Sequence, residues 1–225
     1  DIAMSGAKSL YLSASFILEE GFPLADLQKI VKSMAKAAQE ANVCIIAGDI
    51  KVVEKGKGDG IFITTSGVGV VIADHLHISG DLAKPGDKVI VSGYMGDHGV
   101  AIMSLRHNLQ FQTTIQSDTQ ALHDLVAAMV DAVPDIHCLR DPTRGGLATT
   151  LNEWALQSNV GFLIEEEKIP IRDEVLGACE LLGLDPLYVA NEGKLVAICP
   201  ANKSEKLLTA MQLHPLGKEA AIIGE

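Results

Sequence analysis

The sequence predicts an α+β protein of the α/β type, built from two domains. Apolar residues alternate with polar ones from Leu10 to Leu18, as in a β-strand. Apolar residues from Leu24 to Ala38 instead recur every three or four positions, as in an amphipathic helix. After the turn at Lys84–Asp87, predicted strands and helices alternate along the chain. We therefore expect a strand-rich domain at residues 1–84 and an α/β domain at residues 85–225.

In the first domain, the helix is expected to start near Pro23, a residue that the first turn of a helix tolerates, and to stop at Asn42. A short buried strand is expected from Val43 to Ala47. Two further strands, Lys51–Glu54 and Ile61–Val71, are joined by a glycine-rich loop and are expected to form a hairpin.

The second domain is expected to begin with a strand and to continue with a strand–helix rhythm. Helices are predicted at about residues 98–109, 120–133, 145–158, 172–182 and 203–213. Strands are predicted at about residues 88–92, 136–139, 161–166, 187–190, 194–199 and 220–224.

Charge and cysteine usage exclude several function classes. With 18 basic and 29 acidic residues the net charge is −11, which repels nucleic acid and anionic membranes at long range. No apolar run approaches the roughly 20 residues that span a bilayer. The four cysteines are far apart, without metal-ligand spacing, and lie in apolar contexts typical of buried thiols. This usage predicts a reduced, cytoplasmic protein.

Two loops in the first half of the chain carry residues suited to phosphate and metal. Asp49 follows an apolar strand, and Lys51, two residues on, points to the same side. A carboxylate beside a lysine can hold Mg²⁺ and an anionic phosphate, although a turn with a surface salt bridge explains the spacing equally well. The loop Gly96-Asp97-His98-Gly99 leads from a strand into a helix, whose N-terminus attracts anions. Asp97 can ligate a metal or cap the helix, and His98 can shuttle a proton.

Two loops in the second half complete the set. In Asp141–Gly146, Arg144 offers a bidentate phosphate contact ahead of the paired glycines Gly145 and Gly146, or the segment is an ordinary capped turn. In Asn191-Glu192-Gly193-Lys194, apolar flanks favour partial burial of Glu192, which would raise its pKa toward that of a general base. A type I turn is the alternative. The residues alone thus indicate a Mg²⁺-dependent binder of a phosphorylated ligand, without naming a reaction.

Taken together, these loops resemble the aminoimidazole ribonucleotide synthetase-like superfamily of ATP-using enzymes, and within it the carbamoyl dehydratases of [NiFe] hydrogenase maturation. The resemblance covers essentially the whole chain. Its motifs lie at residues 1–7, 16–21, 48–53, 96–99, 141–146, 191–195 and 214–218. Each motif is weak alone, but the set at these spacings is specific.

The resemblance implies a two-domain aminoimidazole ribonucleotide synthetase-like fold, with a homodimerising first domain and an ATP cleft. It implies ATP-dependent conversion of an S-carbamoyl group on a C-terminal cysteine into thiocyanate, the source of an iron cyanide ligand, through a phosphorylated intermediate. HypF is the carbamoyl donor in that family, and the HypC–HypD complex receives the cyanide.

The same resemblance assigns roles to individual residues. Asp1 and Asp49 are expected to bind metal and phosphate, with Asp97 as a further metal ligand, and Lys51 and Arg144 as cationic contacts. Gly96, Gly99, Gly145 and Gly146 would shape the ATP-binding loops, with Asn191 beside them. Glu192 is expected to be the general base and His98 its proton relay, with Lys51 beside them in catalysis.

The family's reactive cysteine ends a C-terminal tail, and a glycine-rich segment with an aspartate precedes the position of Asp1; these 225 residues contain neither. We expect both to belong to a longer chain, and the four cysteines present to be no substitute. Two alternatives remain: a sister ATP-dependent enzyme such as selenophosphate synthetase or thiamine-monophosphate kinase, and a non-catalytic dimeric scaffold. A nicotinamide-dependent oxidoreductase is disfavoured, because Ile72 stands where a dinucleotide fingerprint beginning at Gly67 needs its third glycine.

Overall fold

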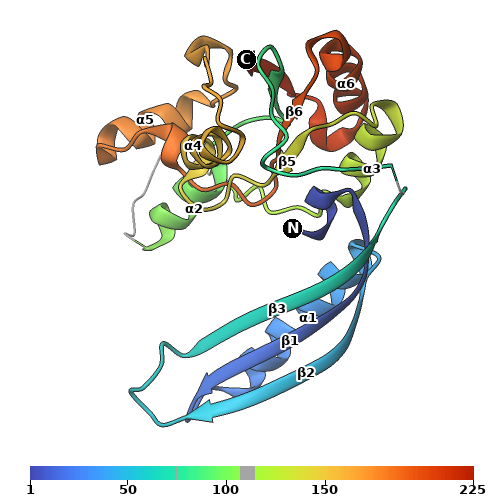
Figure 1. The fold of residues 1–225 in the computed structure, drawn as a ribbon. Helices are drawn as coiled ribbons and strands as arrows, with labels where there is room; N and C mark the ends of the chain where they lie inside the picture. The colour runs from blue at the N-terminus through green and yellow to red at the C-terminus, as the bar shows by residue number, and fades with distance from the viewer. Residues whose placement is uncertain (74, 107–114) are drawn as a thin grey trace. The chain divides into compact units, whose positions relative to one another are not determined.

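The computed structural model describes residues 1–73, 75–106 and 115–225, which form two compact units (Figure 1). Unit 1 contains Asp1, Ala3–Gly6 and Ala73–Glu225, and unit 2 contains Ile2 and Ala7–Ile72. Both combine helices with a β-sheet, which confirms the predicted α+β class. A domain boundary after residue 84 stays a prediction.

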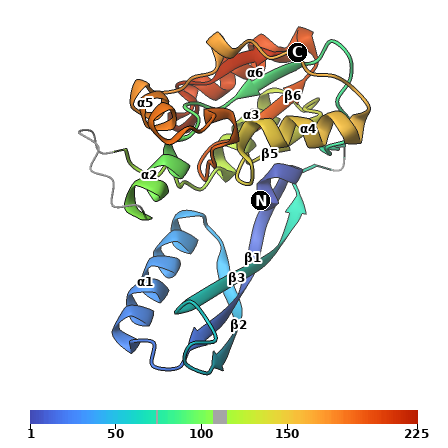
Figure 2. The ribbon, with the colours of Figure 1, turned by 90° about the vertical axis from the view of Figure 1, so that its left-hand side faces the viewer.

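Unit 2 is a three-stranded sheet with one helix along a face (Figures 1 and 2). Its elements are β1 (Ala7–Glu19), α1 (Leu24–Glu40), β2 (Cys44–Val53) and β3 (Ile61–Val71). The long strand β1 lies in the centre, parallel to β2 and antiparallel to β3. The predicted β1 and α1 are therefore confirmed.

Two predictions for this unit are wrong. The strands that flank the glycine-rich loop do not form a hairpin, because β1 lies between them and pairs with both. The Glu19 carboxylate at the end of β1 accepts hydrogen bonds from the amides of Gly56 and Gly60, which holds the loop as it crosses from one edge to the other. In addition, Val43–Ala47 and Lys51–Glu54 belong to a single strand, since β2 stays paired with β1 from Cys44 to Val53.

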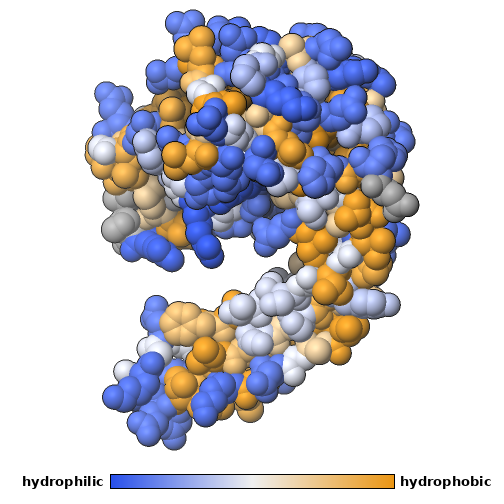
Figure 3. Space-filling view, viewed as in Figure 1, coloured by the Kyte–Doolittle hydropathy of each residue, from blue (hydrophilic) through white to orange (hydrophobic). Residues whose placement is uncertain are grey.

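The sheet of unit 2 carries many apolar side chains at its surface (Figure 3). They include Tyr11, Ile17, Ile45, Ile46, Ile50, Val52, Phe62, Ile63, Val68, Val70 and Val71. The strand expected to be buried at residues 43–47 is thus exposed from Cys44 onward, and Cys44 is not the buried thiol that its neighbours suggested. The other cysteines, Cys138, Cys179 and Cys199, are buried as predicted.

Unit 1 is built on a four-stranded antiparallel sheet with the strand order β5-β6-β4-β7. These strands are β4 (Lys88–Val91), β5 (Cys138–Arg140), β6 (Val196–Cys199) and β7 (Ala221–Gly224). The α-helices are α2 (Asp97–Arg106), α3 (His123–Ala132), α4 (Gly146–Ser158), α5 (Asp173–Leu182) and α6 (Ala201–Leu213), and short 3₁₀ turns lie at Ile2–Ser5, Glu166–Lys168, Pro186–Tyr188 and Pro215–Gly217. The part of the predicted α2 beyond residue 106 lies outside the described residues.

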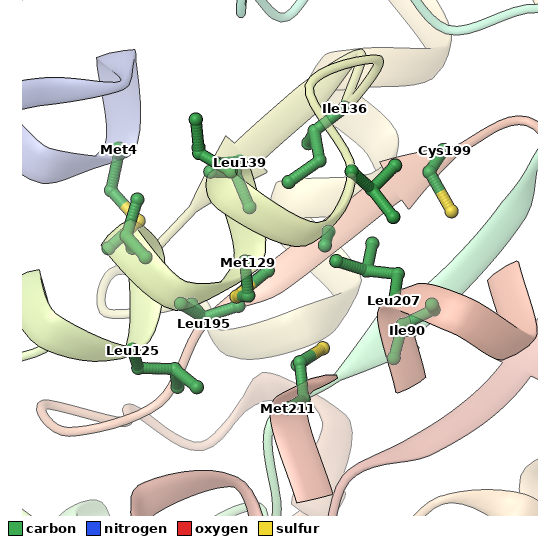
Figure 4. Close-up of a cluster of buried hydrophobic side chains, with 14 of the residues drawn as sticks. Met4, Ile90, Leu125, Met129, Ile136, Leu139, Leu195, Cys199, Leu207 and Met211 are labelled. Atoms are coloured by element: carbon green, nitrogen blue, oxygen red, sulfur yellow. The ribbon is translucent and has the colours of Figure 1, made fainter. Parts of the chain in front are cut away.

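Alternation along the strands divides the core of unit 1 between the two faces of the sheet. Ile90 of β4 points into a cluster with helices α3 and α6, where Met129, Leu207 and Met211 are buried and Met4 of the N-terminal 3₁₀ turn joins them (Figure 4). The residues of β4 on either side of Ile90 pack on the opposite face of the sheet, against α4. Trp154 of α4 is buried in this second cluster, as predicted. Helices on both faces make unit 1 a three-layer structure.

Two predicted strands of unit 1 are wrong. The segment at 161–166 makes one isolated bridge, from Ile164 to Gly224, before it turns into a 3₁₀ helix. The segment at 187–190 begins inside a 3₁₀ helix, whose first residue is Pro186. The Asp185 side chain caps this helix by accepting a hydrogen bond from the Leu187 amide at 2.9 Å. Within the part of the chain that the structure describes, no helix is both long and apolar enough to cross a membrane.

Candidate functional site

Three loops of unit 1 are tied together by the buried side chain of Asn191. Its Oδ1 accepts a hydrogen bond from the Gly96 amide at 2.7 Å, and its Nδ2 donates to the carbonyls of Pro142 and Val189 at 3.2 and 3.0 Å. Its own amide donates to Pro142 as well. Asn191, expected beside the cofactor, therefore joins the loops at residues 96–99, 141–146 and 191–194.

Glycines allow these loops to approach one another. Gly146, at the first position of α4, has φ +62°, and a Cβ there would collide with the carbonyl oxygens of Leu187 and Val189. Gly99, in the first turn of α2, donates its amide to Ala190 O at 3.0 Å, and a Cβ there would overlap the side chain of Val189. The structure thus brings Gly96, Gly99, Gly145 and Gly146 into one region of unit 1.

His98 and Glu192 come together at the edge of this region. His98 Nε2 lies 4.0 Å from Glu192 Oε1, and His98 Nδ1 shares a 2.8 Å hydrogen bond with Ser117 Oγ. The imidazole is 19% exposed and the carboxylate 39% exposed. The Glu192 carboxylate is therefore only partly covered, and the residues on either side of it, Asn191 and Gly193, are buried. A carboxylate and an imidazole thus face each other at the surface of unit 1.

Asp118 lies behind Glu192 and is almost entirely buried. Its side chain is 3% exposed, its Oδ1 accepts a hydrogen bond from the Glu192 amide at 3.1 Å, and its Oδ2 lies 3.5 Å from Lys194 Nζ. The Lys194 ammonium also donates to the Gly193 carbonyl at 3.3 Å. Asp118 and Lys194 therefore form a buried ion pair directly beneath the turn.

Asp97 is the buried carboxylate of the glycine loop. Its Oδ2 accepts a hydrogen bond from Arg172 Nε at 3.1 Å, and the guanidinium of Arg172 stacks 4.0 Å from the centre of the Tyr94 ring. Burial raises the pKa of Asp97, while Arg172 and Lys194 act in the opposite direction. Its Oδ1 is buried, and no described residue forms a hydrogen bond with it. A buried carboxylate oxygen of this kind suits a cation or a donor supplied by a ligand.

The remaining predicted residues are exposed. Arg144 lies in the turn before α4, and Asp1 precedes the 3₁₀ turn of unit 1. Asp49 and Lys51 belong to unit 2, on one face of β2, and Asp49 Oδ1 accepts a hydrogen bond from the Ile50 amide. Among the described residues no group of three or more His, Cys, Asp or Glu side chains is arranged to hold a metal ion.

Sequence reasoning missed Ser117, Asp118 and Arg172. The first two follow a polar stretch with no motif, and Arg172 starts a helix that looked purely structural, so only distance in three dimensions reveals them. A cavity of about 390 Å³ also opens beside His98 and Gly99, with Met103, Tyr188 and Val189 in its walls. It gives an approach to the imidazole from the side of α2.

Comparison with known proteins decides the family. The model for the N-terminal domain of AIR synthase related proteins matches residues 1–71, and the model for the C-terminal domain matches residues 84–225. A chain in a crystallised HypE–HypF complex is 53% identical to this one, with a TM-score of 0.96. The match covers 99% of this chain and 73% of the crystallised chain. The chain belongs to the HypE group of the AIR synthase related family.

Curated members of the HypE group are similar along the whole chain. Carbamoyl dehydratase HypE of Azotobacter vinelandii is 66% identical over 224 residues, and the HypE of Escherichia coli K12 is 44% identical over 225. The chain spans 65% of the length of the Azotobacter protein. A HypE crystallised with ATP is 49% identical with a TM-score of 0.96, over all of this chain and 67% of the other. A thiamine-monophosphate kinase of Aquifex aeolicus, at 19% identity and a TM-score of 0.74, shares the fold alone.

Proposed function

We propose that the whole protein is an ATP-dependent carbamoyl dehydratase of [NiFe] hydrogenase maturation. It converts an S-carbamoyl group on a cysteine of its C-terminal tail into thiocyanate, from which the cyanide ligand of the iron is made. The observation that carries the proposal is the 66% identity to a carbamoyl dehydratase HypE over 100% of this chain. The facing pair His98 and Glu192 supports it, since the reaction needs a base at an accessible surface.

The chemistry removes one water from a primary amide. The carbamoyl oxygen attacks the γ-phosphorus of ATP, ADP leaves, and the nitrogen loses one proton, which gives an imidoyl phosphate. The nitrogen then loses its second proton as the carbon–oxygen bond breaks, inorganic phosphate leaves, and a carbon–nitrogen triple bond forms. The oxygen thus departs as phosphate, a far better leaving group than hydroxide, and no electrons are exchanged with an outside reagent.

Two groups of this chain would handle the protons. The Glu192 carboxylate, 39% exposed, accepts a proton from the nitrogen, and His98, 4.0 Å away, passes it toward solvent. The hydrogen bond between Ser117 Oγ and His98 Nδ1 fixes the ring so that Nε2 faces Glu192. Asn191 and the glycines at 96, 99, 145 and 146 hold the loops around this pair.

We propose ATP as the cosubstrate, and Lys51 of unit 2 and Arg144 of unit 1 as the cationic side chains that would contact phosphate. Three carboxylates would each suit Mg²⁺: among the described residues Asp97 keeps a buried oxygen free of hydrogen bonds, and Asp1 and Asp49 are exposed, the last in unit 2. Because Mg²⁺ takes one or two protein carboxylates and completes its shell with phosphate oxygens and water, it does not need a preformed cluster. When bound, it neutralises charge on the phosphates during phosphoryl transfer.

The partners follow from the same assignment. HypF would supply the carbamoyl group and HypC–HypD would receive the cyanide, both in the cytoplasm. A homodimer formed through unit 2 would cover the exposed apolar side chains of its sheet, such as Ile46, Val52, Phe62 and Val68 (Figure 3).

The deciding experiment is the intact mass of the full-length protein after carbamoylation by its HypF partner, with and without Mg-ATP. We expect the mass to fall by one water only when Mg-ATP is present. Glu192→Gln should slow this loss by about 10²–10⁴-fold, the usual contribution of a general base. The control Glu180→Gln, at an exposed position of α5, should react at the wild-type rate. A carbamoyl mass that persists while ATP binds would refute the dehydratase assignment.

A further inference from the structure

Asp118 contacts each residue of the turn that carries Glu192. Its Oδ1 binds the Glu192 amide at 3.1 Å, and its Oδ2 lies 3.5 Å from Lys194 Nζ. Gly193 packs so closely on the Asp118 backbone that a Cβ at position 193 would overlap the Asp118 carbonyl. One residue therefore fixes three consecutive positions from a distant part of the chain.

Ser117, the residue before Asp118, contacts His98, the other member of the His98–Glu192 pair. Ser117 Oγ shares a 2.8 Å hydrogen bond with His98 Nδ1 and a 2.7 Å bond with Thr119 Oγ1. The dipeptide Ser117-Asp118 thus holds the imidazole with one side chain and the glutamate backbone with the next. A shift of this dipeptide would change the His98–Glu192 distance from both ends.

Burial of the Asp118–Lys194 ion pair costs desolvation free energy, so stability alone does not explain the pair. The Asp118 side chain is 3% exposed and that of Lys194 16% exposed, so both charges have lost most of their hydration. A buried ion pair contributes little net stability, because desolvation offsets most of the attraction, whereas the loss of one partner leaves an uncompensated charge. The pair restricts the turn to one conformation.

We propose that Asp118, paired with Lys194, is a positioning residue that sets the place of Glu192 relative to His98. The inference rests on the proposed function, in which Glu192 takes the proton from the carbamoyl nitrogen. Asp118 touches neither the substrate nor the reacting atoms; it acts through the Glu192 backbone and through its ion pair with Lys194. A misplacement of about 1 Å costs up to about 10²-fold in rate when reacting groups are prealigned.

The test uses the full-length protein, carbamoylated by HypF, and measures three quantities for each variant. These are the rate of water loss in a single turnover, the dissociation constant for Mg-ATP, and hydrogen exchange at the peptide that contains Glu192. The variants are Asp118→Asn, Asp118→Ala and Lys194→Met. Asp131→Asn, at an exposed position of α3, is the matched control.

We expect Asp118→Asn to slow water loss by about 10–100-fold, with ATP affinity within about 2-fold of wild type. The asparagine oxygen still accepts the Glu192 amide, so exchange at this peptide stays slow, whereas Asp118→Ala removes the acceptor and should make it fast. The double variant Asp118→Asn with Lys194→Met should lose no more rate than the worse single variant, because both break the same contact.

Wild-type water loss in Asp118→Asn would overturn the inference, and so would a loss of ATP affinity in proportion to the loss of rate. Unchanged exchange in Asp118→Ala would overturn the contact itself, without any measurement of activity. Should Asp118→Ala not fold, Asp118→Asn and Lys194→Met decide the question. Failure of the proposed function appears separately, as wild-type protein that keeps its carbamoyl mass in Mg-ATP.

Discussion

Asn191 Oδ1 accepts a 2.7 Å hydrogen bond from the amide of Gly96, a residue in a different loop. The same side chain donates to Pro142 and Val189 through Nδ2. Since all of these atoms are buried, water cannot replace a lost bond. A single amide side chain thus connects the glycine loop to two other loops.

Asn191→Ala should destabilise unit 1 and disturb the loops together. Each buried polar group left without a partner costs about 1–3 kcal/mol, and we expect a total of about 3 kcal/mol in the free energy of unfolding. Asn152→Ala, which removes an exposed amide bonded to Ala148 O in α4, should change it by less than about 0.5 kcal/mol. Urea unfolding of both variants measures the difference. Equal effects at the two positions would contradict the role of Asn191.

Gly146→Ala should be more damaging than an ordinary glycine replacement. A left-handed backbone costs an L-residue about 1–2 kcal/mol, and the new Cβ also meets the Leu187 and Val189 carbonyls, so the total should reach about 2–4 kcal/mol. Gly177→Ala is the control, because it lies in α5 with open space around it and should stabilise the protein by about 0.5–1 kcal/mol. Thermal and urea unfolding would show whether each replacement lowers or raises the free energy of unfolding.

Glu19 should make the stability of unit 2 depend on pH. Hydrogen bonds from the Gly56 amide, and then from the Gly60 amide, lower the pKa of Glu19 from its ordinary value of 4.5. A lowered pKa means that folding favours the ionised form, so the stabilisation is complete above pH 4.5 and disappears as the pH falls through the lowered pKa. Glu19→Gln should therefore melt below wild type at pH 7 and match it at the acid end.

Circular dichroism melts between pH 3 and 7 would measure this convergence. Glu20→Gln, at the exposed neighbouring position, serves as the control and should follow the wild-type curve throughout. A gap between Glu19→Gln and wild type that stays constant with pH would show that the carboxylate charge has no part in holding the loop.

The cysteines should divide into one reactive and three protected thiols. Burial raises the pKa of Cys138 and Cys199 to about 12, and it raises that of Cys179 as well. Cys44 is exposed on β2. Since the thiolate is the reactive form, iodoacetamide at pH 8 should label Cys44 first, and the others only after unfolding. Peptide mass mapping identifies the labelled residue; Cys44→Ser should abolish the fast reaction, and rapid labelling of Cys138 would contradict the prediction.

Periodic segments of the sequence predicted the fold well. Helix α1 and strand β1 follow directly from the spacing of their apolar residues, although no residue of α1 is buried in its unit. The pairing of the strands was harder to predict from the sequence. Adjacent strands in sequence commonly pair, yet β2 and β3 are separated by β1, and the contact that stabilises the crossing loop comes from Glu19, which no local pattern links to Gly56.

The site shows the same limit. The glycine loops could be predicted, since strand–glycine–helix junctions have a recognisable sequence. Asp118 could not, because its role depends on the burial of a charge beside Lys194, and a single aspartate in a polar stretch resembles any surface residue. Partial burial of Glu192 was expected from its apolar neighbours; in the structure its side chain is 39% exposed and lies between two buried residues.

The N-terminal 3₁₀ turn has a consequence for the order of folding during synthesis. Ala3 and Met4 are made before the other residues of their hydrophobic cluster, and their partners Met129, Leu207 and Met211 emerge from the ribosome much later (Figure 4). Unit 2, whose strands are contiguous in the chain, can pair its sheet in the meantime. Unit 1 must wait until α6 has been translated, so a nascent chain stalled before α6 would present Met4 to chaperones.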